Sequence, residues 1–90
     1  MKVREFEEKV WAIEGVRIVL RVDQNTEVGD YPYERAADET WRITELMEKR
    51  ILKNSGEISW VVIQGDGEQP HGAVILRTIR RSYGGYNSSN

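Results

Sequence analysis

The run from Val16 to Val22 restricts the fold of this chain most, because apolar residues occupy every second position in it. In an extended chain the even-numbered residues of this run lie on one face, whereas Arg17, Val19 and Arg21 lie on the other. This alternation predicts a strand that is buried on one face only. The chain is therefore expected to contain a sheet with one face against a core and the other face directed outward.

A turn signal precedes this strand. Glu14 and Gly15 separate it from an earlier β-rich run, and glycine tolerates the positive φ of a two-residue turn. We therefore predict a hairpin whose first strand covers residues 8–13, where β-branched and aromatic residues favour a strand. A short amphipathic helix is the alternative, because apolar residues also recur at helical spacing there. Those residues are Val3, Phe6, Val10 and Ile13.

The middle of the chain combines a polar loop with a long helix. Residues 23–32 are rich in Asp, Asn, Gly and Pro, which are typical of loops. Apolar residues then recur at helical spacing from Glu34 to Lys53, and Pro32 just before them suits a first helical turn. The pattern predicts one helix over residues 34–53, ended by the Asn-Ser-Gly sequence of residues 54–56.

A second hairpin is predicted in the C-terminal part of the chain. Residues 58–64 and 73–82 are rich in strand-forming residues, and the loop of residues 65–72 between them contains glycine and proline. This order predicts an α+β fold, a two-layer sandwich in ββαββ order with one long helix on a four-stranded antiparallel sheet. We expect residues 1–83 to form a single domain and residues 84–90 to form a disordered tail.

The composition of the 90 residues excludes several classes of protein. The absence of cysteine removes disulfides, thiolate zinc sites and cysteine nucleophiles. The formal net charge of −2 argues against a whole-surface electrostatic attraction to nucleic acid. No apolar run approaches the about 18 residues of a membrane helix, and residues 1–6 lack the character of a signal peptide. We therefore expect a cytoplasmic protein with no membrane contact.

The uncovered face of the predicted sheet indicates self-association. One helix covers one face only, and apolar residues fall on the opposite face at Val19, Ile75 and Ile79. A 90-residue domain also has a core of marginal size, which an interface with another chain would enlarge. We expect a homo-oligomer, with a dimer favoured, and a different protein is the other partner that this face suits.

Basic and aromatic residues on the predicted sheet indicate an alternative function, the binding of nucleic acid or a phosphate ligand. If the second and last strands are adjacent, their arginines form a row that could bind phosphates, and a tyrosine could stack on bases. The candidate residues are Arg17, Arg21, Arg77, Arg80, Arg81 and Tyr83. The simpler interpretation is an ion-paired and solvated face, because carboxylates such as Glu5, Glu7 and Glu8 are available as partners.

The loop of residues 65–72 contains the only histidine beside two carboxylates. Asp66, Glu68 and His71 are ligand types that divalent metals accept, so a metal-dependent hydrolase is a third and less favoured hypothesis. A zinc site would need at least one more histidine, and a solvated loop explains these residues more simply. No residue is assigned a catalytic role, because no serine lies in a nucleophile turn and no phosphate loop is present. We expect no cofactor.

Four stretches, VWAIEGVRIVLRV, YPYERAADET, GDGEQPHG and RTIRRSY, resemble small uncharacterised proteins carried on mobile gene cassettes. None of these stretches contains a catalytic signature, and the resemblance implies no activity and no functional residue. The sequence therefore predicts a small self-associating interaction module, with nucleic-acid or phosphate binding as the alternative.

Overall fold

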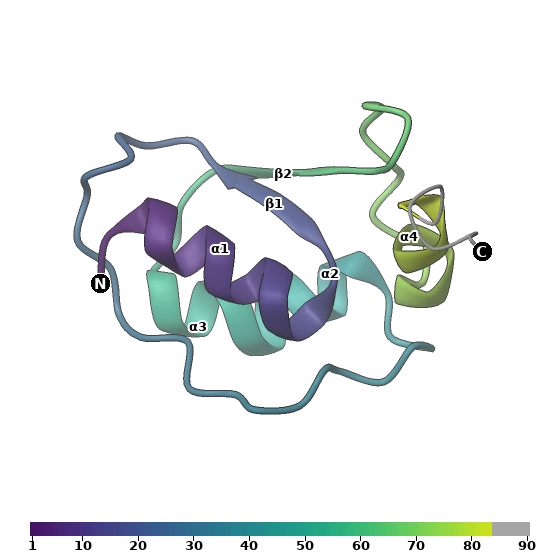
Figure 1. Ribbon diagram of the computed structural model, residues 1–90, viewed down its shortest axis with the longest axis horizontal. Coiled ribbons are helices and arrows are strands. Elements are labelled where there is room, and N and C mark those ends of the chain that lie inside the picture. The colour runs from purple at the N-terminus through teal and green to yellow at the C-terminus, as the bar shows by residue number, and fades with distance from the viewer. Residues whose placement is uncertain (84–90) are drawn as a thin grey trace.

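A two-stranded antiparallel sheet lies against helices in the computed structural model, which describes residues 1–83 of the chain (Figure 1). The elements in chain order are α1 (Val3–Glu14), β1 (Arg17–Leu20), α2 (Ile43–Leu46), η1 (Met47–Ile51), α3 (Leu52–Ser55), β2 (Trp60–Ile63) and α4 (Leu76–Ser82). α2, η1 and α3 follow one another without a break and form one helix, whose middle section, η1, is a π-helix. The α+β class is therefore confirmed, whereas the ββαββ order and the four-stranded sheet are wrong.

The hairpin predicted around Glu14 and Gly15 is wrong, because the residues before Gly15 form α1. Gly15 has a φ of 68°, and its N–H donates a hydrogen bond to the carbonyl of Trp11 at 3.0 Å. A left-handed glycine suits the end of a helix as well as a tight turn, so this residue alone does not distinguish the two. The helical spacing does distinguish them, because three residues that share it are fully buried. These residues are Val3, Phe6 and Val10.

The strand predicted after Val16 exists as β1, and the assignment of its two faces is confirmed. Ile18 and Leu20 are buried, whereas Arg17 and Val19 are exposed. β1 pairs with β2 in a register that places Val19 opposite Val61. The partner of β1 therefore comes from the second half of the chain, and the two strands are joined by the helices rather than by a tight turn.

The long helix is shorter and begins later than its apolar pattern predicts. It covers residues 43–55, and residues 21–42 contain no helix and no strand of the sheet. Asp38 explains the late start, because its carboxylate accepts hydrogen bonds from the N–H and the hydroxyl of Thr40 at 2.8 and 2.6 Å. Such local bonds compete with a helix. The helix then begins after Arg42, whose N–H is accepted by the Glu45 carboxylate at 3.0 Å.

The last predicted strand is wrong as well, because its C-terminal part forms the helix α4. Leu76 and Ile79 are both fully buried, at the three-residue spacing that places side chains on one face of a helix. Ile75 precedes this helix and forms an isolated antiparallel bridge with Arg42. The chain from β2 to α4 therefore turns away from the sheet and returns to the start of the helix of residues 43–55, which we call the central helix.

The core lies between the inner face of the sheet and the helices. Its largest fully buried side chains include Tyr31, Phe6, Leu20 and Met47. All three tryptophans are only half-buried. Within residues 1–83, no helix has both the length and the apolar character needed to cross a membrane. The disordered tail predicted for residues 84–90 lies outside the residues that the structure describes.

Candidate interaction surface

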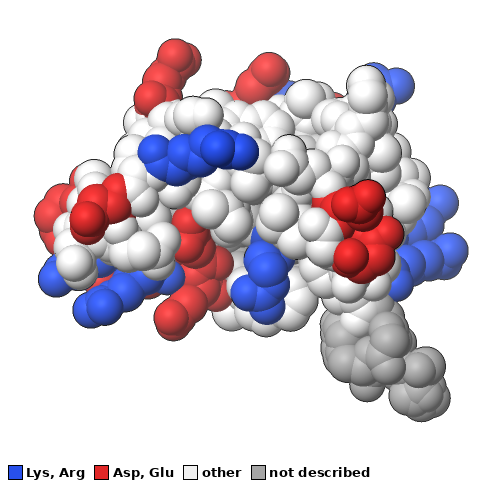
Figure 2. All heavy atoms as spheres, turned by 90° about the horizontal axis from the view of Figure 1, so that it is seen from above, with Lys and Arg blue, Asp and Glu red and all other residues white. Residues whose placement is uncertain are grey.

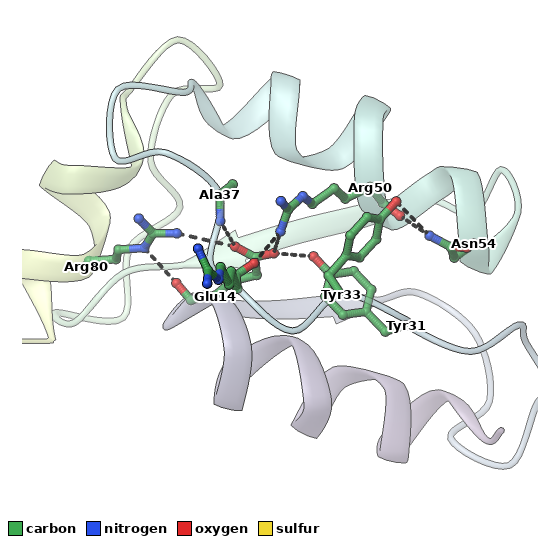
Figure 3. Close-up of polar contacts among 8 residues, drawn as sticks. Glu14, Tyr31, Tyr33, Ala37, Arg50, Asn54 and Arg80 are labelled. Carbon is green, nitrogen blue, oxygen red and sulfur yellow. Dashed lines mark hydrogen bonds and ion pairs between the residues drawn. The ribbon is translucent and has the colours of Figure 1, made fainter.

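A buried polar cluster surrounds the carboxylate of Glu14, the last residue of α1 (Figure 3). One carboxylate oxygen accepts hydrogen bonds from the Tyr31 hydroxyl at 2.5 Å and from the Arg50 guanidinium at 2.7 Å. The other accepts the N–H of Ala37 at 2.7 Å and the Arg80 guanidinium at 3.3 Å. Arg80 also donates to the Glu14 carbonyl at 2.6 Å. Glu14 therefore connects α1 with η1, α4 and the irregular segment of residues 21–42.

Two guanidinium groups and the Tyr31 hydroxyl surround the buried carboxylate of Glu14. The side chain of Glu14 has 0% exposure, and two guanidinium groups offset its negative charge. Burial, together with the hydrogen bond to Glu14, raises the pKa of Tyr31 far above its usual range. Although burial by itself lowers the pKa of Arg50, the adjacent Glu14 carboxylate raises it overall. Both carboxylate oxygens of Glu14 accept hydrogen bonds in these contacts, so the cluster holds the fold together.

A groove of about 220 Å³ lies on the surface between α1 and β1. Glu7 spans one part of it, because its carboxylate accepts the Leu20 N–H at 2.8 Å and the Gln24 side-chain amide at 3.3 Å. These bonds attach α1 to the edge of β1 that does not face β2. The residues that line the groove are Arg4, Glu7, Glu8, Trp11, Arg17, Ile18, Val19 and Gln24.

Trp11 and Arg17 are held in place at one end of this groove. The Arg17 guanidinium lies 4.6 Å from the centroid of the Trp11 ring, and the Tyr83 ring meets Trp11 edge to face at 5.0 Å. The Tyr83 hydroxyl accepts the Arg17 N–H at 3.1 Å and donates a short hydrogen bond to the Ile63 carbonyl. Tyr83 therefore connects the end of β1 to the end of β2, and burial raises its pKa.

The outward face of the sheet adjoins the groove through Arg17 and Val19. The strand register places Val19 opposite Val61 and Arg17 opposite Ile63 on this face. Val19 is 38% exposed, and the only other large apolar side chain of comparable exposure in residues 1–83 is Val22 at 37%. We call the groove and this sheet face together the outer surface.

The predicted row of arginines on one sheet does not form, because α4 is a helix and carries three of them. Arg80 is bound to Glu14, and Arg77 forms an ion pair with Glu39 at 3.2 Å. Arg81 is exposed on α4, while Arg17 and Arg21 are exposed at β1 and just after it. Seen over β1 and β2, the surface shows acidic and basic side chains separated by uncharged area, with no continuous basic patch (Figure 2). The hydroxyl of Tyr83 is hydrogen-bonded to the backbone of both strands, at Arg17 and Ile63.

The loop proposed as a metal site is held by bonds among its own residues. The Asp66 carboxylate accepts the Glu68 N–H at 2.9 Å, which lowers the pKa of Asp66. His71 accepts the Ala73 N–H at 3.2 Å through its Nδ1 atom. Among residues 1–83, no group of three or more histidine, aspartate or glutamate side chains lies close enough to hold a metal ion. The loop connects β2 to α4 and does not belong to a hairpin.

Of the three residues predicted to form an interface, only Val19 lies on the outward face of the sheet. Ile79 has 0% exposure inside the core, and Ile75 is half-buried in its bridge to Arg42. The sequence interpretation placed both on a strand that does not exist. Arg50 and Tyr31 were not among the predicted site residues, and Glu14 was predicted to lie in a turn. A glutamate at the end of an amphipathic helix, where the helix dipole is unfavourable to it, is the available signal of a compensating partner.

Comparisons with protein-family models, curated proteins and solved structures found no match to this chain. The resemblance to gene-cassette proteins stays a prediction.

Proposed function

We propose that this chain is a small protein-interaction module that binds its partner through the outer surface. The observation that carries this proposal is the exposed side chain of Val19, which lies opposite the half-buried Val61 on the outward face of the sheet. The opposite face is buried in the core, through Ile18 and Leu20. A small sheet with one buried and one apolar outward face gains stability when a second molecule covers the outward side.

The residues around this pair have the properties of an interaction surface. Trp11 and Arg17 are among the residue types that contribute most to binding energy in protein interfaces, and here they are stacked on each other at 4.6 Å. Because Tyr83 packs on Trp11 and bonds to the Arg17 backbone, these anchors are already ordered before a partner arrives. Preordered side chains reduce the entropy lost on binding.

Glu14, the most buried carboxylate among residues 1–83, is not placed for catalysis. Glu14 already accepts hydrogen bonds from Tyr31, Ala37, Arg50 and Arg80. A general acid or base must reach a substrate proton, and Glu14 is enclosed by its own partners. The groove beside β1 is open to solvent and has charged side chains at its rim, which suits a protein contact.

Photo-crosslinking in cells tests this proposal. The photoreactive residue p-benzoylphenylalanine replaces Val19. In a matched control it replaces Lys53, an exposed residue of α3 outside the outer surface. The proposal expects discrete crosslinked products from the position of Val19 that are absent from the Lys53 control. If illumination gives the same products from both positions, or none from Val19, the outer surface is not an interaction site.

A further inference from the structure

We propose, on the basis of the proposed function, that the partner of the outer surface is a second copy of this chain. The two copies are related by a two-fold axis, and Arg17 of each copy faces Glu8 of the other. In such an interface the same patch occurs on both sides, so every contact between two different residues is made twice.

The charges of the groove fit a copy of the same surface. Its rim carries two guanidinium groups, from Arg4 and Arg17, and two carboxylates, from Glu7 and Glu8. Such a patch can meet itself with each cation opposite a carboxylate, whereas a polyanion would be repelled by half of these groups. The charges of the outer surface therefore suit a partner that carries both signs of charge, as a second copy does.

Three of these charged side chains form no ion pair with the other residues of the described range, 1–83. Glu7 is bonded to Leu20 and Gln24. Arg4, Glu8 and Arg17 take part in none of the ion pairs within 4.0 Å among residues 1–83. They are available for contacts with another molecule, unlike Arg77 and Arg80 on α4.

The positions of these residues make reciprocal contacts possible. Glu8 and Trp11 are three residues apart in α1, so they share one side of the helix, and both line the groove. Arg17 lies over the Trp11 ring, and Val19 follows two residues later on the same outward face of β1. A second copy can therefore place its Glu8 against Arg17 while the apolar residues around Val19 come together beside this charged contact.

Charge reversal in two separate variants tests the pairing by sedimentation equilibrium. Arg17→Glu creates a Glu–Glu contact at both ends of the interface, and Glu8→Arg creates an Arg–Arg contact at both ends. We expect each variant to self-associate at least about tenfold more weakly than the original protein, because like charges meet at both ends of the interface. A tenfold change in affinity corresponds to about 1.4 kcal/mol. In an equimolar mixture the two variants restore opposite charges at both contacts, so a mixed dimer forms with the original affinity.

The control variants are Arg81→Glu on α4 and Glu48→Arg on η1, two exposed charges outside the outer surface. Circular dichroism verifies that all variants are folded, and the controls should dimerise like the original protein. The inference is overturned if the original protein stays monomeric up to about 1 mM, if neither reversal weakens the dimer, or if the mixture fails to restore it. A crosslink from Val19 to a different protein, together with a monomeric chain, would overturn this inference but leave the proposed function standing.

Discussion

The hydroxyl of Tyr31 donates a hydrogen bond at 2.5 Å to the carboxylate of Glu14, although the two residues are 17 positions apart. This bond connects the irregular segment to the end of α1. Arg50 and Arg80 bring η1 and α4 to the same carboxylate. The stability of the fold therefore depends strongly on a cluster of charged and polar groups.

The variant Glu14→Gln should unfold far more easily than the original protein. It leaves two guanidinium groups without the charge that offsets them, and breaking a buried ion pair in this way costs about 3–5 kcal/mol. Urea unfolding followed by circular dichroism measures this loss. The control is Glu48→Gln, an exposed residue of η1, for which we expect a change within about 0.5 kcal/mol. Equal stability of the two variants would show that the cluster does not stabilise the fold.

The free energy of unfolding should fall in alkaline solution partly because of Tyr31. Its pKa is raised in the folded protein, chiefly by burial, while an unfolded tyrosine titrates near pH 10. Above about pH 10 the unfolded chain loses this proton and the folded protein keeps it, so stability decreases by up to about 1.4 kcal/mol per pH unit. Urea unfolding between about pH 9 and pH 11 should show a steeper decrease for the original protein than for Tyr31→Phe. Parallel curves would contradict the prediction.

The variant Gly15→Ala should be less stable by about 1 kcal/mol, because Gly15 has a φ of 68°. Space is not the limiting factor, since an added Cβ would lie 3.7 Å from the nearest atom of Arg80. The matched variant Gly15→Asn should lose less, because asparagine adopts left-handed backbone angles more readily than alanine. Thermal unfolding of the three proteins checks the order. An alanine variant as stable as the original would argue against this helix end.

The variant Tyr83→Phe should loosen the end of the sheet without unfolding the protein. It keeps the ring that packs on Trp11 and removes the hydroxyl between Arg17 and Ile63. We expect a stability loss of about 1 kcal/mol, the usual net contribution of a hydrogen bond. Hydrogen exchange measured by NMR should show faster exchange of the Arg17 amide, while the amide of Arg21, bonded to Ser59 at 2.8 Å, changes little. Unchanged exchange at Arg17 would show that this contact does not protect the strand.

The sequence predicts the strands of this fold better than its helices. The alternation after Val16 identifies the buried face of β1, because only an extended chain places every second side chain on one side. The segment before Gly15 satisfies both a strand preference and a helical spacing, and local preference points to the wrong one. α4 presents the same conflict. The two-residue spacing of Leu76 and Thr78 suits one face of a strand, whereas the three-residue spacing of Leu76 and Ile79 suits one face of a helix. Contacts with the rest of the core decide in favour of the helix.

The candidate site could be predicted only in part. Val19 and Arg17 were identified as outward-facing because they belong to an alternating strand. Their neighbour Trp11 comes from a segment whose helical form was only the alternative, so the groove between α1 and β1 could not be foreseen. The Glu14 cluster was also missed, because Arg50 and Arg80 lie 36 and 66 positions away in the sequence. No local pattern relates residues at such separations.

The π-helical section η1 allows the central helix to bury every fourth residue. Ile43, Met47, Ile51 and Ser55 follow one another at every fourth position, and all four are buried. A regular helix turns by about 100° per residue, so each step of four residues overshoots one full turn by about 40°. Residues spaced in this way would gradually rotate out of the core. The wider turn of η1 takes up part of that excess, so removing one residue from η1 would rotate Ser55 and the rest of α3 relative to Ile43.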